Sequence, residues 1–273
     1  MPSPFSIYIG GPMNIISVCS FKGGTAKTSI ALNVGAALAK FYDKHVLIID
    51  FDAQANLTAG LGFDPDNYDS LAAVLQEKKG IEEVILHTKQ QHLDLIPADT
   101  WLERVEITDL LASDRYSHEK LSKIVHQLHY DIVIIDTPPS LCWLTESALI
   151  ACNHALICAT PEFYSIKGLQ RLSYFIHYIS QRHPLEILGV ALSFWNVRGK
   201  NNDNFLQVID DTFPEKILHT KIRRDIAIAE ASIHGKSVFD IRPKSRAAKD
   251  LYSLTKEILQ KTSDELVCQN AIL

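Results

Sequence analysis

Short runs of apolar residues alternate along the chain with stretches of helical periodicity. The runs are rich in Val and Ile and are apolar at successive positions, as in strands covered on both faces. They are Ile15–Cys19, Val46–Ile49, Leu93–Ile96, Ile132–Ile135, Ala155–Ala159 and Ile187–Leu192. The helical stretches are Thr28–Phe41, Leu71–Lys78, His118–His129, Ser140–Cys152, Ile166–Arg182 and Ser245–Leu259. This alternation predicts an α/β fold with a doubly wound, mostly parallel sheet and helices on both faces.

The alternation starts at residue 14 and is not interrupted by a repeat, a low-complexity tract or a linker. We therefore expect residues 13–273 to form a single domain. Residues 1–12 are apolar and turn-forming and carry no Lys or Arg, whereas a secretory signal would begin with positive charge. We expect them to be an N-terminal extension outside the fold, either flexible or foreign to the natural chain.

Composition narrows the range of functions. The formal net charge is -5 and 22% of the residues are charged, which excludes a disordered polyelectrolyte and a general polyanion-binding surface. The five cysteines include no Cys-x-x-Cys pair, which favours reduced, buried thiols over an iron–sulfur cluster shared between two chains. No apolar stretch is long enough to span a bilayer.

The segment Ser20–Thr28 carries the most specific chemical signal. Its sequence follows a predicted strand, opens a predicted helix and contains Gly23 and Gly24. N–H groups at a helix start attract anions, and glycines let backbone amides turn toward phosphate oxygens. We therefore expect Lys27 to neutralise the β and γ phosphates of a nucleotide and the Thr28 hydroxyl to bind Mg²⁺. The alternative is a glycine-rich turn without a ligand, and the Lys-Thr pair argues against it.

Carboxylates close two of the predicted strands. Asp50 and Asp52 follow one apolar run, and Asp136 follows another. Because the carboxyl ends of parallel strands share the ligand edge of a sheet, we expect these acids close to the phosphate loop. Mg²⁺ prefers carboxylates together with waters and phosphates, so Asp136 is a candidate for the metal. A solvated acidic turn is the alternative for Asp50 and Asp52.

Taken together, the motifs resemble those of the ParA and MinD family of P-loop NTPases, which have a deviant Walker A loop. The family loop Lys-Gly-Gly-x-Gly-Lys-Thr is matched from Lys22 to Thr28 with Ala26 in place of its last Gly, and the family's Asp-x-Asp-Pro-Gln motif is matched with Ala53 in place of Pro. Its Asp-x-Pro-Pro motif is matched at residues 136–139, and the similarity continues through residues 222–226 and 234–236. In detail the chain looks most similar to the members carried by chlamydial virulence plasmids.

This resemblance implies an ATPase of plasmid or DNA partition that binds ATP and Mg²⁺ in a sandwich dimer. It implies that Lys22 reaches the partner's nucleotide, that Asp50 organises Mg²⁺ and its waters, and that Asp52 positions the attacking water. It also implies nonspecific DNA binding, for which Arg198 and Arg224 are the candidates, and stimulation by a ParB-like partner. Such a protein works in the bacterial cytoplasm on the nucleoid or a plasmid. The residues expected at the nucleotide are Lys22, Gly23, Gly24, Thr25, Ala26, Lys27, Thr28, Asp50 and Asp136.

Membrane targeting of the MinD kind needs a basic amphipathic tail. Residues 251–273 have no basic face, because Lys256 and Lys261 are outnumbered by acidic residues. We therefore expect no membrane binding.

Two positions depart from the general Walker A pattern, which has Gly where this chain has Phe21 and Ala26. The first departure, together with Lys22, defines the deviant loop, whereas Ala26 departs from the family loop as well. If the backbone there needs a positive φ, alanine is strained by about 1 kcal/mol. An alternative function follows, in which a nucleotide-gated binding or regulatory protein hydrolyses ATP weakly or not at all.

Overall fold

The computed structural model describes residues 13–107, 117–161, 166–199 and 202–270, so the expectation for residues 1–12 lies outside the described residues. Within them, eight strands form one sheet in the order β3-β4-β2-β5-β1-β6-β7-β8. Only the β3–β4 pair is antiparallel. The strands are β1 Asn14–Cys19, β2 Val46–Asp50, β3 Leu86–His87, β4 Leu93–Ile96, β5 Ile132–Asp136, β6 His154–Ala159, β7 Glu186–Trp195 and β8 Ile217–Arg223.

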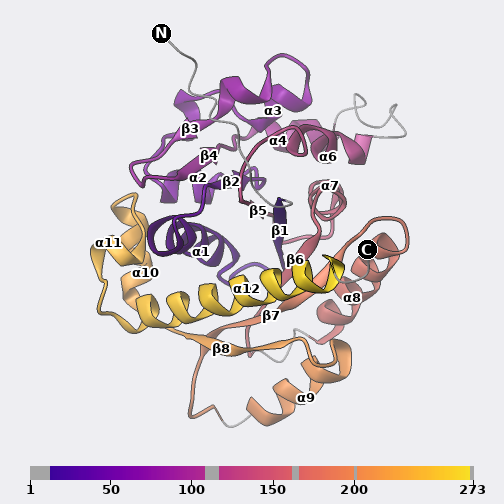
Figure 1. The fold of residues 1–273 in the computed structure, drawn as a ribbon, viewed down its shortest axis with the longest axis vertical. Helices are drawn as coiled ribbons and strands as arrows, with labels where there is room; N and C mark the ends of the chain where they lie inside the picture. The colour runs from indigo at the N-terminus through magenta and orange to yellow at the C-terminus, as the bar shows by residue number, and fades with distance from the viewer. Residues whose placement is uncertain (1–12, 108–116, 162–165, 200–201, 271–273) are drawn as a thin grey trace.

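Helices cover both faces of this sheet, which confirms the predicted doubly wound architecture. One apolar core joins the sheet to α1, α2, α10, α11 and α12, and a second joins it to α3, α4, α6, α7, α8 and α9. Figure 1 shows the yellow α12 lying along α1 and across β7 and β8. The helices are α1 Lys27–Tyr42, α2 Asn56–Gly60, α3 Leu71–Leu75, α4 Trp101–Ile107, α6 Lys120–Val125, α7 Trp143–Ala151, α8 Ile166–Ser180, α9 Asn202–Thr212, α10 Ile226–Ile233, α11 Val238–Ile241 and α12 Arg246–Asn270.

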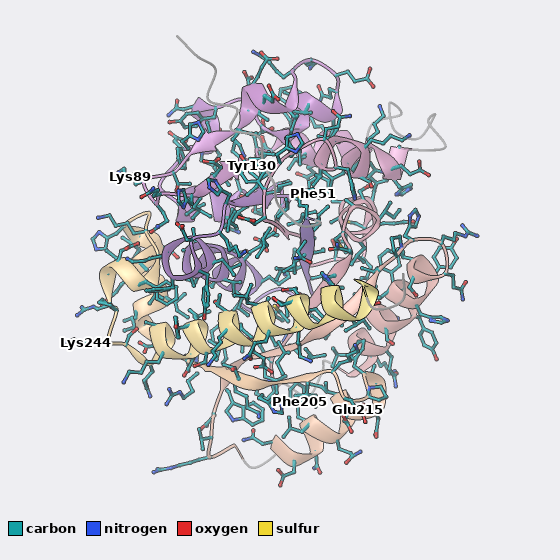
Figure 2. All side chains as sticks on the ribbon, in the orientation of Figure 1. Phe51, Lys89, Tyr130, Phe205, Glu215 and Lys244 are labelled. Carbon is teal, nitrogen blue, oxygen red and sulfur yellow. The ribbon has the colours of Figure 1, made fainter. Side chains whose placement is uncertain are left out.

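The central strands are buried on both faces because their apolar residues are continuous rather than alternating. In β1, Ile15 packs into the core beneath α7, and its neighbour Ile16 packs into the core beneath α1. The same division holds along β2 and β5. In Figure 2, Phe51 lies in the interior just beyond β2, whereas Lys89 and Lys244 point outward at the edge of the molecule. This two-sided burial explains why Val and Ile dominate these strands.

The order of the strands places one switch point at the middle of the sheet. β1 lies between β5 and β6, and the chain leaves β1 toward β2 on one side and later returns to β6 on the other. In such sheets, ligands bind beyond the carboxyl ends of the strands at this point. The segment after β1, the ends of β2 and β5, and the end of β6 therefore surround one site.

The outer edge of the sheet at β8 is closed by side chains of α12. The two carboxylate oxygens of Glu257 accept hydrogen bonds from the backbone N–H groups of His219 and Thr220, at 2.7 and 3.0 Å. Asp250 accepts from the backbone N–H of Arg223 at 3.0 Å. Because these donors are already bound, they are not free to pair with a further strand on this edge.

Several helix boundaries differ from the sequence-based expectation. The stretch His118–His129 contains a 3₁₀ turn at Ser117–Glu119 and the short α6, which is capped at His126. The closing helix extends to Asn270 rather than Leu259. The strand β8 and the helix α9 were not predicted at all. In the described part of the chain, no helix is long and apolar enough to cross a membrane.

Candidate functional site

The segment Ser20–Ala26 forms a loop between β1 and α1, at the switch point of the sheet. Gly24 and Ala26 both have left-handed backbone conformations, with φ of 75° and 61°. Ala26 is the residue immediately before α1, and its conformation matches the one for which glycine was expected. An alanine in this region costs about 1 kcal/mol relative to glycine. The loop therefore keeps the shape of a phosphate-binding turn at the expense of local strain.

The lysine that opens α1 is held in place by the loop itself. Lys27 is buried, and its Nζ donates a hydrogen bond of 3.1 Å to Oγ of Ser20. That hydroxyl donates in turn to the backbone carbonyl of Lys22, at 2.7 Å. A buried ammonium group needs acceptors or a negative partner. These two hydrogen bonds give the Lys27 ammonium group an acceptor and keep its positive charge at the start of α1, where a phosphate would be attracted.

Two carboxylates occupy adjacent ends of β2 and β5. Asp50 and Asp136 are register partners in the parallel pair, and both are fully buried. Oδ2 of Asp50 accepts hydrogen bonds from the backbone N–H and the hydroxyl of Thr58, at 2.8 and 2.7 Å. Burial raises the pKa of Asp50 to about 6, against the opposing effect of Thr58. Asp50 therefore also anchors α2, a role that the motif did not predict.

Asp136 is the most perturbed acid of the site. Burial and then the nearby charge of Asp50 raise its pKa to about 8, and Thr28 and Lys27 oppose this shift. Within the described residues, neither carboxylate oxygen of Asp136 accepts a hydrogen bond of ordinary geometry. A buried carboxylate with unused oxygens next to a threonine hydroxyl fits a magnesium ion, which prefers hard oxygen ligands. The residues present therefore fit the expected metal.

Asp52 lies beside Asp50 but is half-exposed, on the loop that leads to α2. Its Oδ1 accepts a hydrogen bond from the backbone N–H of Gln54 at 3.1 Å, and its own N–H donates to Asp50 at 3.3 Å. The loop then turns through Ala55, which has a φ of 52°. This is a second alanine in a left-handed conformation beside the site, and the sequence did not reveal it. The half-exposed carboxylate can hydrogen-bond a water molecule at the mouth of the site.

The aromatic residue of the loop packs against a distant helix. Phe21 lies over Gly168 of α8 so closely that a Cβ added to Gly168 would lie 1.7 Å from Cδ2 of the ring. The ring also packs onto the buried core beneath α8. Phe21, which occupies a Walker A glycine position, therefore ties the phosphate loop to the first turn of α8.

The two arginines proposed for DNA lie together in one pocket. A cavity of about 750 Å³ lies at the ends of β6, β7 and β8. Its lining residues are Thr160, Pro161, Phe194, Trp195, Asn196, Val197, Arg198, Gly199, Asn202, Arg223, Arg224 and Arg246. Asp250 binds Arg223 through two bonds of 2.7 and 2.9 Å. Arg224 instead lies over the ring of Phe194, 5.4 Å from its centroid. Among the described residues, Arg198 and Arg224 are exposed and form no ion pair with a carboxylate.

Comparisons with known proteins agree with this geometry. A family model described as an AAA domain matches residues 13–187. A ParA family protein of Chlamydia trachomatis serovar D is 67% identical over 90% of this chain and 98% of its own length. The virulence plasmid ParA family protein pGP5-D of Chlamydia psittaci is 41% identical over 95% of this chain and 100% of its own. The expected similarity to plasmid-borne chlamydial proteins is confirmed, and the first relative, whose name mentions no plasmid, is more similar still.

Solved structures confirm the P-loop NTPase fold. Cobyrinic acid a,c-diamide synthase from Mycobacterium smegmatis, solved with an ATP analog and magnesium, has a TM-score of 0.81 at 26% identity, covering 91% of this chain and 95% of that one. The septum site-determining protein MinD from Pyrococcus horikoshii, complexed with Mg-ADP, has a TM-score of 0.74 at 26% identity, covering 90% and 96%.

The raised pKa of Asp136 predicts that replacing this residue by asparagine stabilises the fold, and more so at high pH. The folded-state pKa lies above the ordinary value, so ionisation destabilises the metal-free fold increasingly between pH 4 and about 8. Replacing Asp136→Asn should raise the free energy of unfolding more at pH 8.5 than at pH 5, by at least about 1 kcal/mol. Urea unfolding in EDTA measures this, with Asp66→Asn as the exposed control. An equal gain at both pH values would contradict the assignment.

The contact of Phe21 with α8 predicts a steric effect at Gly168. Replacing Gly168→Ala should displace the ring and destabilise the fold by about 1–3 kcal/mol, as overpacking does. The additional change Phe21→Ala should recover much of this loss, because it removes the clashing ring. Thermal unfolding of the single and double variants checks the expectation. Gly80→Ala is the control, since its added Cβ meets only the Glu83 side chain at 3.4 Å; a Gly168→Ala variant as stable as this control would contradict it.

Proposed function

The chain belongs to the ParA family, and on that premise we propose that it is an ATPase of DNA partition that binds ATP together with Mg²⁺. The observation that carries the proposal is the buried Asp136, which has unused oxygens beside Thr28 at the start of α1. A magnesium–triphosphate complex would satisfy this carboxylate and the loop amides at the same time. The ATP analog and the Mg-ADP bound by the two structural neighbours support the same ligand.

The residues of the site divide the work of binding and hydrolysis. Lys27, at the start of α1, binds the β and γ phosphates and offsets the negative charge that develops on them. Thr28 and, mainly through waters, Asp50 and Asp136 would hold Mg²⁺, which neutralises phosphate charge when bound. Asp52 orients the attacking water from its half-exposed position at the mouth of the site. Because the fold already holds these groups in position, they can stabilise the transition state of hydrolysis without first having to reorient.

The nucleoside has room in the neighbouring pocket. The 750 Å³ cavity lies at the ends of β6, β7 and β8, and Phe194 in its wall directly follows Ser193, which contacts the phosphate loop at Thr25. Its wall contains the buried Thr160 and the rings of Phe194 and Trp195. Aromatic rings beside polar and charged groups suit a base and its ribose. We place the nucleoside against this wall and the exposed arginines at the outer rim.

The active form that we propose is a dimer of two chains facing each other across their nucleotides. Gly23 and Gly24 are exposed, and Lys22 lies half-buried beside them at the mouth of the site. A lysine at this position can reach a phosphate on a facing chain. ATP binding would then favour the dimer, and hydrolysis would release it.

DNA binding belongs to the same proposal. Arg198 and Arg224 lie on one surface, and a dimer would double the number of positive charges presented to a duplex. Contacts of this kind bind phosphates without reading bases. The proposal also includes a ParB-like protein that stimulates hydrolysis and association of the dimer with nucleoid or plasmid DNA. Similarity to the virulence plasmid proteins supports a role in plasmid partition.

A second candidate function is favoured by the left-handed Ala26. If its strain weakens the phosphate loop, the protein acts as a nucleotide-gated binding or regulatory protein with slow or absent hydrolysis. The dimer and its DNA contacts would then be controlled by nucleotide binding alone. The two candidates differ in turnover and agree on binding.

Nucleotide-dependent sizing tests the proposed function. We expect a monomer without nucleotide or with ADP, and a dimer with ATP and Mg²⁺. Asp52→Ala should retain the ATP-induced dimer for longer, because water placement is impaired while phosphate binding is not. Light scattering coupled to gel filtration measures both. A wild-type chain that binds no ATP in the presence of magnesium would refute the proposal.

Turnover distinguishes the two candidates. Replacing Ala26→Gly removes strain worth about 1 kcal/mol, so nucleotide affinity or hydrolysis should rise up to about fivefold. Phosphate release with and without DNA measures the change. Unchanged affinity and turnover would show that the loop tolerates Ala26 and would remove the reason for the second candidate.

Salt dependence tests the DNA surface. Arg224→Ala should weaken nonspecific DNA binding by the ATP-bound protein and reduce the slope of log affinity against log salt by about 1 per lost contact. Lys244→Ala, an exposed change outside the pocket, is the control. Equal affinity of Arg224→Ala and wild type across a salt series would exclude this arginine.

A further inference from the structure

A buried serine of β7 is bonded to the phosphate loop. Ser193 has no exposed surface, and its hydroxyl donates a hydrogen bond of 2.9 Å to the backbone carbonyl of Thr25. The carbonyl of Ala159, at the end of β6, lies 3.4 Å from the same oxygen. Ser193 belongs to none of the nucleotide motifs, and it is separated from the loop by 168 positions along the chain. The hydroxyl therefore joins the end of β7 to the loop that follows β1.

This bond fixes the orientation of one peptide group. The carbonyl of Thr25 and the N–H of Ala26 belong to the same planar trans peptide, so they point in opposite directions. When the carbonyl points at Ser193, the N–H of Ala26 points away from β7. The rotation of this plane about the N–Cα bond of Ala26 is the angle φ, which is 61° here. Holding the carbonyl therefore helps to hold Ala26 in its left-handed conformation.

The strain of Ala26 and the hydrogen bond from Ser193 have opposite effects on the orientation of the Thr25–Ala26 peptide. For alanine, the strain shifts the equilibrium between left-handed and other backbone conformations away from the left-handed one by roughly fivefold. Glycine has no such strain. One buried hydrogen bond is worth a comparable factor. The conformation of the loop thus depends on Ser193 more in this chain than it would with glycine at position 26.

We propose that Ser193 is a positioning residue for nucleotide binding, whose hydroxyl holds the Thr25–Ala26 peptide in the phosphate-binding orientation against the strain of Ala26. Ser193 acts through this peptide, to which its hydroxyl is hydrogen-bonded. The inference rests on the proposed function, because it concerns the loop that would bind a triphosphate. It makes β7 part of the nucleotide site, although β7 carries no recognised motif.

A double-mutant cycle tests the proposal. The four proteins are wild type, Ser193→Ala, Ala26→Gly and the double variant, and calorimetry gives the Kd of ATP with Mg²⁺ for each. Ser193→Ala should raise Kd about 5- to 10-fold in the natural background. In the Ala26→Gly background the same change should raise Kd less than about twofold, because glycine needs no support to stay left-handed.

Ser147→Ala is the matched control. Ser147 is equally buried, lies in α7, and its hydroxyl has no hydrogen-bond partner among the described residues. Its Kd should stay within about twofold of wild type in both backgrounds. Steady-state kinetics gives a second readout, since Ser193→Ala should raise KM for ATP without a matching fall in kcat.

Three outcomes decide the question. An equal loss of affinity for Ser193→Ala in both backgrounds would show a general packing role and overturn the inference while leaving the proposed function intact. A wild-type protein that folds but binds no ATP would overturn both. If Ser193→Ala does not fold, restored folding and binding in the double variant would support the inference, and failure of the double variant would overturn it.

Discussion

The structure depends on placing two buried carboxylates next to each other where β2 and β5 end. Burial raises the pKa of both Asp50 and Asp136, and the nearby charge of Asp50 raises that of Asp136 further. Such an arrangement persists only if positive or hydrogen-bonding groups compensate it. Thr58 compensates Asp50, and Lys27 and Thr28 partly compensate Asp136. The parallel sheet makes this possible, because it brings the ends of β1, β2 and β5 together and starts α1 directly beside them.

The fold was predictable where strands are buried on both faces, and it was missed where burial is partial. Val and Ile fill β2 and β5 at successive positions, so the apolar pattern alone located them. β8 contains His219, Thr220 and Lys221 and is only partly covered, so its pattern resembles a polar loop. Its strand conformation comes from pairing with β7 and from the carboxylates of α12, which no local pattern contains. The same reason explains the missed α9, which is polar except for residues such as Phe205 and Ile209.

The site was predictable to the extent that its residues belong to contiguous motifs. The phosphate loop, Asp50 and Asp136 come together as expected because each follows a core strand. The supports of these residues come from elsewhere in the chain and could not be predicted. Gly168 makes space for Phe21, and Ser193 binds the loop carbonyl. A single glycine or serine belongs to no motif of fixed spacing, so the residues that it contacts become known only from the fold. We considered from the sequence that the backbone at Ala26, where the family has glycine, could need a positive φ, and the structure has one there.

The closure of β8 by α12 limits how two copies of this chain can associate. An open strand edge offers a row of unpaired donors on which a second chain can continue the sheet. Here Glu257 and Asp250 accept hydrogen bonds from N–H groups along that edge, so a strand from another molecule would first have to displace these bonds. The opposite edge is β3, only two residues long, which is too short to template an intermolecular ribbon. Self-association through continuous sheets is thus disfavoured at both margins of the sheet.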